Sequence, residues 1–193
     1  MAQSTYTIDQ FVTDVRQVFA NVQDARARAQ GVAKHMKDLL AASDLTEEIN
    51  RRAGGRRGRI DLHIDEKYGH PAPGFCLMTS ISGPGSGEGP GGRLPHDHGA
   101  SFVVYGVYKG AIEQTKYKWI YAKEGEWTSP ELRESERFVQ RPGEVAFFLP
   151  GEIHKTTRVG SEPPMVIRLE AQWLNRVLRH AYNPENNSVV LQK

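Results

Sequence analysis

Seven histidines carry the side chains best suited to chemistry at neutral pH, and two of them are separated by a single residue. His96 and His98 flank Asp97, just after a Gly- and Pro-rich stretch and just before an apolar run. If this segment is extended, both imidazoles lie on one face, about 6–7 Å apart along the chain. Such a pair suits two ligands of one metal ion. The other histidines are His35, His63, His70, His154 and His180.

His154 is the candidate for a third ligand. It follows Pro150-Gly151-Glu152-Ile153, a tight turn at the end of the apolar run 145–149. The turn ends one strand and starts the next with its first side chain in a fixed position. The stretch from 98 to 154 is long enough for two or more hairpins, which would return the chain to the first two histidines.

The elements that must position these histidines are strands. From residue 75 onward the chain consists of short β-branched or aromatic runs separated by turn residues. Seven or more such runs at close spacing indicate a β-sandwich or a barrel. The runs are 75–81, 101–108, 111–121, 137–140, 144–149, 154–159 and 165–169.

The N-terminal part is predicted to be helical and to pack on this β-domain. Thr7 and Gln10 have the spacing of a capping box, and apolar residues follow at helical intervals as far as Leu40. Asp44, followed by two glutamates, indicates that one helix stops and another begins. We therefore expect a helical segment over 1–52, a barrel over 60–183 and a polar tail over 184–193.

Composition argues against a nucleic-acid partner. The chain has 193 residues, enough for one domain or one domain plus a helical appendage. Its 25 Lys and Arg against 23 Asp and Glu give a net charge of +2, whereas a nucleic-acid-binding domain usually has a larger, clustered excess. A group of arginines stands among glycines without interleaved aromatic residues, and we interpret it as a mobile solvated loop. These arginines are Arg51, Arg52, Arg56, Arg57 and Arg59.

The single cysteine, Cys76, excludes an intrachain disulfide and a zinc ribbon. The N-terminus has no apolar signal core, and no run of about 18 apolar residues occurs. We therefore expect a cytoplasmic protein with no membrane partner. Cys76, His35 and His180 are interpreted as structural or surface residues.

The glycine-rich stretch over 82–92 is not a phosphate loop. It lacks the Gly-Lys-Ser/Thr ending, and prolines replace backbone donors that would cradle a phosphate. We interpret it as a long flexible loop ahead of a strand, and whether it forms a lid stays open.

The two histidine motifs resemble those of the cupin superfamily. His96-Asp97-His98, with Gly110 closing the motif, is similar to the first cupin motif, and Gly143 through Pro150-Gly151 to His154 is similar to the second. The resemblance implies a mainly-β cupin double-stranded β-helix, a jelly-roll barrel, with an N-terminal helical cap. The usual glutamate of the first motif has no counterpart in residues 99–104, so the implied ligand set is three neutral histidines: His96, His98 and His154.

Within that superfamily the chain resembles the cysteine dioxygenase group of thiol dioxygenases. The similarity includes the stretches 75–85, 106–113 and 176–185. It implies a non-haem Fe(II)-dependent dioxygenase that adds O2 to a small anionic substrate, such as a thiol carboxylate. Three neutral ligands would leave a net charge of +2 and about three open positions on Fe(II), which favours an anionic, chelating substrate. Zn, Ni or Mn could occupy the same histidines in purified protein, and the oligomeric state stays open between monomer and dimer.

The chain departs from the thiol dioxygenase pattern at the substrate wall. Where the group has a Ser-x-His-x-Tyr stretch, counting back from the Arg179-His180 ending places Val166, Arg168 and Glu170. The position of the crosslinking cysteine falls at Val103, so that cofactor cannot form. The residue that binds the substrate carboxylate falls near His63.

Three residues of this wall are candidate catalytic residues. In the family register, Arg168 and Glu170 face the cavity, where Arg168 could clamp a substrate carboxylate and Glu170 could act as a base or orient the arginine. The alternative is an exposed ion pair on an outer strand face. Tyr105 either lines the cavity or is an ordinary core tyrosine. Asp97 is expected to form hydrogen bonds with the backbone, or with the ring nitrogen of a ligand histidine that does not face the metal, rather than to bind the metal itself.

Two other functions remain open from the sequence. One keeps the iron and cleaves a C–C bond of a diketone or hydroxy-ketone, which the loss of the Ser-His-Tyr set favours and the N-terminal helices disfavour. The other is a non-catalytic metal-binding cupin, in which the ligands persist beside an altered substrate wall.

Overall fold

Three helices precede the strands in the computed structural model, which describes residues 6–81, 94–120 and 131–192. The helices are α1 (Ile8–Asn21), α2 (Ala25–Leu40) and α3 (Leu45–Ala53). The capping box of α1 is confirmed, because Thr7 accepts from the Gln10 backbone and Gln10 accepts from the Thr7 backbone. Asp44 caps α3 by position, although its side chain makes no capping hydrogen bond. The predicted loop over 82–92 lies outside the described residues.

The strands of the described residues form two antiparallel sheets and a hairpin. One sheet has the order β1-β2-β8-β3-β6, the other has the order β5-β4-β7, and β9 pairs with β10. The bounds are β1 (Gly58–Ile64), β2 (Cys76–Ile81), β3 (Val103–Lys109), β4 (Ala111–Ile120), β5 (Glu131–Gln140), β6 (Val145–Phe148), β7 (Ile153–Val159), β8 (Met165–Glu170), β9 (Arg179–Asn183) and β10 (Ser188–Gln192).

The chain crosses between the two sheets repeatedly, as a jelly-roll barrel requires. It goes from β3 in the first sheet to β4 and β5 in the second, then back to β6, across to β7 and back to β8. Several strands pair antiparallel with partners far along the chain, such as β3 with β8 and β4 with β7. The predicted mainly-β, double-stranded β-helix fold with an N-terminal helical cap is thus confirmed.

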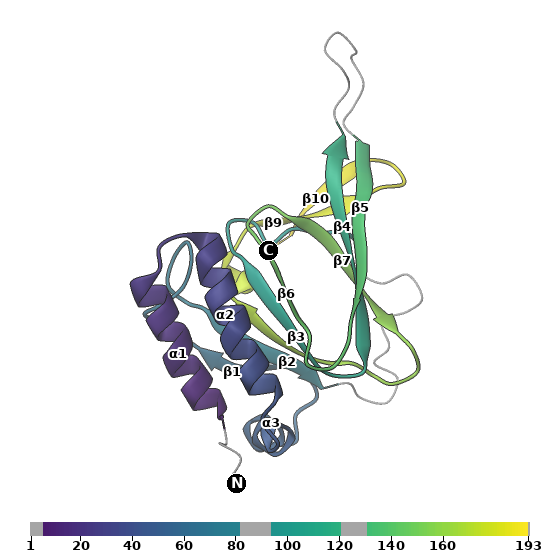
Figure 1. Cartoon of the computed structure of the whole chain (residues 1–193). Helices are drawn as coiled ribbons and strands as arrows, with labels where there is room; N and C mark the ends of the chain where they lie inside the picture. Colours follow the sequence, from purple (N-terminus) through teal and green to yellow (C-terminus); the bar gives the residue numbers. More distant parts are fainter. Residues whose placement is uncertain (1–5, 82–93, 121–130, 193) are drawn as a thin grey trace.

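The helices cover the outer face of the five-stranded sheet, as Figure 1 shows. Helix α2 packs against β3 and β6, and Gly106 of β3 permits this approach, because an added Cβ would lie 2.7 Å from Cγ of Met36. On the same strand Val104 belongs to the helix-side core, whereas Val103 and Tyr105 belong to a second cluster between the sheets. Alternate residues of β3 therefore serve two cores, one outside and one inside the barrel.

The interpretation of the arginine group as a mobile solvated loop is wrong for the residues that form ion pairs. Arg52 lies in α3 and binds Glu48 and Asp9 at 2.9 and 2.8 Å. Arg59 lies in β1, a strand that the glycine-rich composition did not predict, and it reaches into the barrel wall. Arg59 is held in place because β1 pairs with β2.

The C-terminal residues differ from the expected polar tail. Ser188–Gln192 forms β10, which pairs residue by residue with β9. Its apolar residues Val189, Val190 and Leu191 are about half-exposed, so backbone pairing with β9 holds this strand more than burial does. No helix of the described residues is long and apolar enough to cross a membrane.

Candidate metal centre

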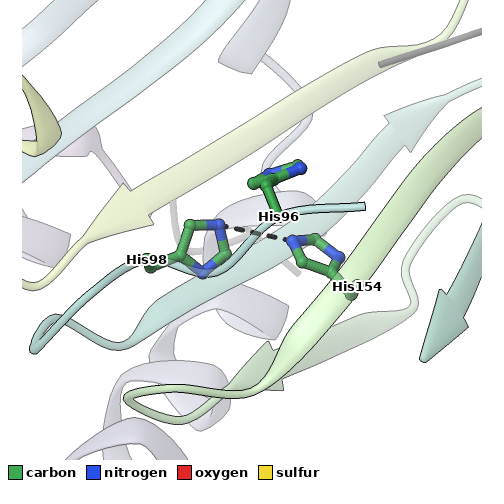
Figure 2. Close-up of side chains that lie close together, drawn as sticks. All are labelled: His96, His98 and His154. Atoms are coloured by element: carbon green, nitrogen blue, oxygen red, sulfur yellow. Dashed lines mark hydrogen bonds between the residues drawn. The ribbon is translucent and has the colours of Figure 1, made fainter. Parts of the chain in front are cut away.

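His96, His98 and His154 converge inside the barrel, as Figure 2 shows. One ligand nitrogen from each lies within 4.8 Å of the other two. His98 and His154 are fully buried, and His96 is nearly so. His154 lies in β7, whereas His96 and His98 lie on the segment before β3, outside the regular strands, where His96 forms isolated bridges.

The distance between two ring nitrogens fits a shared ion. Nε2 of His98 and Nε2 of His154 are 3.3 Å apart. Two nitrogens bound to one ion at about 2.1 Å each are separated by about 3.0 Å at a right angle and about 3.4 Å at a tetrahedral angle. Two nitrogen lone pairs this close repel unless a proton or a cation lies between them.

Burial keeps the imidazoles of His98 and His154 neutral. It lowers the pKa of His98 far below the ordinary value, and the neighbouring His154, His96 and Arg168 lower it further. Burial also lowers the pKa of His154, with added effects of His96, Arg168 and Lys116. A neutral imidazole has a nitrogen lone pair to offer, so the set fits a divalent transition-metal ion at neutral pH.

A buried amide network fixes the orientation of His154. The Gln114 amide donates to Oε1 of Gln140 at 3.0 Å, so its own Oε1 is the acceptor that faces Nδ1 of His154 at 3.0 Å. Thr156 donates to the same oxygen at 2.8 Å. His154 therefore has its proton on Nδ1 and its lone pair on Nε2, which faces His98.

His96 is fixed by backbone. Its Nδ1 lies 3.1 Å from the carbonyl oxygen of Leu94, which can only accept, so Nε2 is left as the ligand atom. Its backbone N–H and C=O both pair with those of His154 at 2.9 Å. Hydrogen bonds on Nδ1 thus orient His96 and His154. Nδ1 of His98 has no hydrogen-bond partner among the described residues.

Asp97 forms its hydrogen bonds with the backbone, as expected, and with the side chains of His180 and Tyr182. Its carboxylate accepts from the backbone N–H groups of Gly99 and His180 at 2.8 and 3.0 Å. It also accepts from the Tyr182 hydroxyl at 2.5 Å and lies 3.1 Å from Nδ1 of His180. Burial alone would raise the pKa of Asp97, but these hydrogen bonds outweigh it and lower the pKa.

Tyr105 is buried and lies beside the histidines. Its hydroxyl is 3.4 Å from Nε2 of His98, and its ring packs edge-on against that of His154. Tyr105 also belongs to the apolar cluster between the sheets with Val103 and Phe148. The ring of Tyr105 thus fills the core between the sheets while its hydroxyl faces His98.

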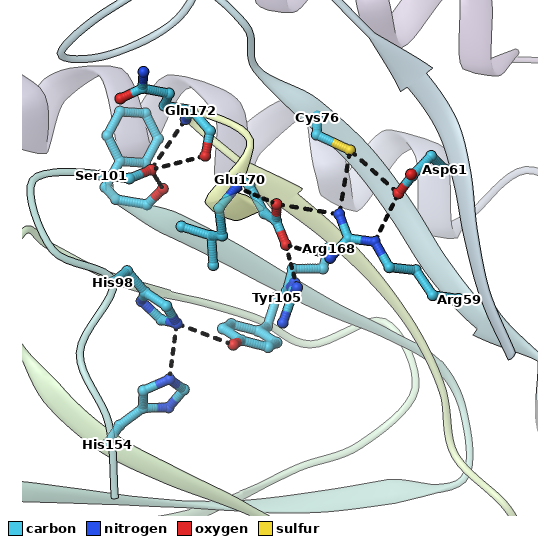
Figure 3. A network of polar contacts seen from close by, with 12 residues as sticks. Arg59, Asp61, Cys76, His98, Ser101, Tyr105, His154, Arg168, Glu170 and Gln172 are labelled. Carbon is cyan, nitrogen blue, oxygen red and sulfur yellow. Dashed lines mark hydrogen bonds and ion pairs between the residues drawn. The ribbon is translucent and has the colours of Figure 1, made fainter. Parts of the chain in front are cut away.

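Arg168 and Glu170 face the barrel interior, where Figure 3 shows them in one polar network with Tyr105. They are ion-paired to each other, and the guanidinium of Arg168 lies 5.8 Å from the centroid of the Tyr105 ring. Burial alone would lower the pKa of Arg168, but Tyr105 and Glu170 more than offset it and hold the pKa above the ordinary value. The exposed outer face considered as an alternative is excluded.

A second arginine shares the fully buried Glu170. Nη1 and Nη2 of Arg59 each donate to a different oxygen of the Glu170 carboxylate, both at 3.3 Å. The Leu174 backbone N–H donates to the same carboxylate at 2.9 Å. Arg59 also donates to Asp61 at 2.8 Å. With so many donors on it, Glu170 is a counter-ion that holds arginines in place.

Cys76 adjoins this network but is unreactive. Its Sγ lies 3.5 Å from Asp61 and 3.7 Å from Arg59. Burial raises the pKa of the thiol to about 12, and the charges of Glu170 and Asp61 act in the same direction. The thiol therefore stays protonated, as expected of a structural cysteine.

Sequence reasoning missed Arg59, Gln114 and Gln140. His63, the position expected for a carboxylate-binding residue, instead contacts Asp65 at 3.3 Å and the ring of Phe75. One signal was present for Gln114: a polar residue at an inward position of a strand that otherwise buries apolar side chains is usually hydrogen-bonded to something specific.

No protein-family model matches the chain, and no curated protein does. A double-stranded β-helix protein from Klebsiella pneumoniae subsp. pneumoniae MGH 78578 is similar at 14% identity over 71% of this chain and 81% of that chain, with a TM-score of 0.36. The cupin domain of Cnp3 from Schizosaccharomyces pombe is similar at 12% over 54% and 55%, with a TM-score of 0.34. A mutant of oxalate decarboxylase OxdC from Bacillus subtilis is similar at 19% over 51% of this chain and 21% of that chain, with a TM-score of 0.32.

At this level of similarity the matches support neither a family assignment nor an activity. The fold follows from the strand pairing of this chain, and its chemistry follows from its own side chains.

Proposed function

We propose that this protein is a non-haem Fe(II)-dependent dioxygenase that acts on a small anionic substrate, with His96, His98 and His154 as metal ligands. The observation that supports it most is the convergence of three buried imidazoles on one point inside a barrel. Buried histidines without a ligand to share would leave polar nitrogens unsatisfied. Fe(II), when bound, supplies the electrons and open positions that allow O2 to react with a coordinating anion.

The charges beside the histidines favour an anionic substrate. Arg59 and Arg168 share the carboxylate of Glu170, and Arg59 also pairs with Asp61, so these two arginines are balanced by two carboxylates. A divalent ion at the histidines would add positive charge that none of these carboxylates is left to offset, and buried charge without compensation is costly. A substrate with one group for the metal and a carboxylate for Arg168 would supply the missing negative charge.

Arg168 is the residue best placed to receive that carboxylate. Its side chain is 16% exposed on the inner face, and among the described residues its buried Nε has no hydrogen-bond partner. Its charge is close enough to the histidines to lower the pKa of His98 and His154. Glu170 orients the guanidinium, and the Tyr105 hydroxyl is in position to donate to a substrate atom near His98.

A thiol carboxylate satisfies these demands with a balanced reaction. The thiolate R–S⁻ and one O2 give the sulfinate R–SO2⁻, in which both oxygen atoms join sulfur and no external reductant is consumed. Arg168 would hold the carboxylate while the sulfur faces the histidines.

Oxygen uptake by reconstituted protein tests the proposal. Apoprotein is loaded anaerobically with Fe(II) and supplied with thiol carboxylates, a thiol amine without a carboxylate, and β-diketones. We expect one O2 consumed per thiol carboxylate, a product heavier by two oxygen atoms, and no uptake by the matched His98→Ala protein. Oxygen uptake with β-diketones and not with thiols would show that the protein cleaves a C–C bond instead of oxidising a thiol. Full iron occupancy without uptake on any compound would point instead to a metal-binding protein without turnover.

A further inference from the structure

The hairpin formed by β9 and β10 is joined to the metal centre through one carboxylate. We propose that Asp97 is a positioning residue that fastens the histidine segment 95–98 to this hairpin, so that the affinity of the centre for a divalent metal depends on the hairpin. This rests on the proposed role of His96, His98 and His154 as metal ligands.

The carboxylate of Asp97 is fully engaged by groups that surround the histidine segment. Its Oδ1 accepts from the backbone N–H groups of Gly99 and His180 at 2.8 and 3.0 Å. Its Oδ2 lies 2.5 Å from the Tyr182 hydroxyl and 3.1 Å from Nδ1 of His180. With four hydrogen-bond partners, two of them on β9 side chains, Asp97 orients its neighbours and is not a ligand.

Backbone hydrogen bonds also join residues 95–98 to β9 on one side and to β7 on the other. Asp97 donates to the His180 carbonyl at 3.1 Å, and Tyr182 donates to the Pro95 carbonyl at 2.8 Å. His96 forms bridges to both His154 and Ala181. Residues 95–98 thus lie between β7 and β9 like a short central strand.

The turn after the segment leaves no space for it to shift. Gly99 has a φ of +58°, a conformation that favours glycine. A Cβ added there would lie 2.1 Å from the carbonyl oxygen of Leu178. The segment that holds His96 and His98 is therefore set by its contacts with residues 178–182 as much as by its own sequence.

The Asp97 contacts can be kept without the charge. In Asp97→Asn the remaining oxygen can still accept from the two backbone N–H groups. The new amide N–H can donate to the oxygen of Tyr182 and to Nδ1 of His180, because a hydroxyl and an imidazole both accept as well as donate. If Asp97 acts through geometry, Asn restores metal binding and Ala does not.

Zn²⁺ is the probe, because its binding needs no substrate and no oxygen. The measurements are the equilibrium affinity, by competition with a chromophoric chelator, and the rate of Zn²⁺ release to excess chelator. Absorption bands of Co²⁺ at the same site report ligand geometry directly. The proteins are wild type, Asp97→Ala, Asp97→Asn, Tyr182→Phe and the control Tyr117→Phe.

The control removes a hydroxyl from the same environment without touching Asp97. Tyr117 packs against the cluster of Leu132, Ile153 and Tyr182, so both Tyr→Phe changes test the same packing. Tyr182→Phe also remains informative if Asp97→Ala fails to fold, since it retains the ring and removes one hydrogen bond.

We expect Asp97→Ala to bind Zn²⁺ about 10- to 100-fold more weakly and to alter the Co²⁺ bands. Tyr182→Phe should release Zn²⁺ about 3- to 10-fold faster, while Asp97→Asn and Tyr117→Phe stay within about 3-fold of wild type. Unchanged affinity in Asp97→Ala and unchanged release in Tyr182→Phe would overturn the proposal, as would an Asp97→Asn loss equal to that of Ala. Failure of wild type to bind Zn²⁺ would instead refute the ligand assignment itself.

Discussion

Gln114 decides which nitrogen of His154 faces the other histidines, because its amide is itself held by Gln140. Replacing Gln114 with Leu removes the amide oxygen that accepts from Nδ1 of His154. The proton of His154 is then free to move to Nε2, the nitrogen that faces His98. We expect Gln114→Leu to bind Zn²⁺ about 10-fold more weakly than wild type, measured by chelator competition.

Thr156 provides the control for this change. Its hydroxyl donates to the same Gln114 oxygen at 2.8 Å but does not touch His154. Thr156→Val should therefore stay within about 3-fold of wild type. Equal losses in the two variants would show that general disruption of the network, and not the His154 tautomer, lowers the affinity.

We expect Arg168 to bind the substrate and to have no part in metal binding. Arg168→Met keeps most of the side-chain volume and removes the charge, so binding of an anionic substrate should weaken by about 2–4 kcal/mol while the metal content stays the same. The measurement is kcat/KM beside metal analysis. Arg158→Met, at the exposed end of β7, is the control. Equal activity of Arg168→Met and wild type on every substrate found would show that Arg168 does not bind substrate.

At this scale the sequence predicted the cluster of three histidines and not the residues that orient it. His96, His98 and His154 are recognisable because residue type and local spacing reveal a ligand motif. Arg59 and Gln114 are not, because each acquires its partner from a distant strand: Arg59 meets Glu170 only across β2 and β8, and Gln114 meets His154 only through the β4–β7 register. Alternation on a single strand predicted that Arg168 and Glu170 share a face, whereas the inner face followed only from the family resemblance, with an exposed pair as the alternative.

Among the elements, α1 is joined to the end of β1 by Asp65. This nearly fully buried carboxylate lies 2.7 Å from Nε of Arg16 in α1 and 3.3 Å from His63 in β1. It also accepts from the backbone N–H groups of Lys67 and Tyr68. Burial alone would raise the pKa of Asp65, but Arg16 and the backbone donors outweigh it and lower the pKa from 3.8 to about 2.

A lowered pKa makes this contact a source of stability above pH 4. The folded state favours the ionised form, so the benefit is complete above the unfolded-state pKa of 3.8 and is lost as the pH falls toward 2. Because Arg16 is half-exposed and screened, Asp65→Asn should lower the free energy of unfolding by about 1–2 kcal/mol at pH 7. Urea unfolding of both proteins from pH 7 to pH 2 should show this difference shrinking below pH 4. A difference that is constant with pH would contradict the ion pair.

The two strands β1 and β10 were missed for different reasons. Strands β2 to β4 and β6 to β8 were predicted because each buries β-branched or aromatic residues on at least one face. Strand β1 also buries Ile60 and Leu62 in the helix-side core, but it was missed because its glycine and arginine resemble a loop. Pairing with β2 and the Arg59 ion pairs stabilise it further. Strand β10 was missed because it buries little, with Val189, Val190 and Leu191 all about half-exposed.

In the whole molecule, stability and chemistry occupy different layers. The largest apolar cluster joins the helices to the outer face of the five-stranded sheet, with Phe11, Phe75 and Phe102 fully buried. Tyr105 and Arg168 lie on the other face of that sheet, inside the barrel, with His98 and His154 beside Tyr105 (Figure 3). Substitution of a histidine should therefore remove metal while the helix-side core keeps the chain folded.

Metal stoichiometry of the histidine variants tests the central claim most directly. Wild type, His96→Ala, His98→Ala, His154→Ala and the control His35→Ala, whose histidine lies on α2, are each loaded anaerobically with Fe(II), desalted and analysed for iron per folded chain. We predict about one ion per chain for wild type and His35→Ala, and less than about a tenth for each of the other three, because two imidazoles rarely retain an ion that needs three. Equal occupancy in all five proteins would contradict the three-histidine metal centre.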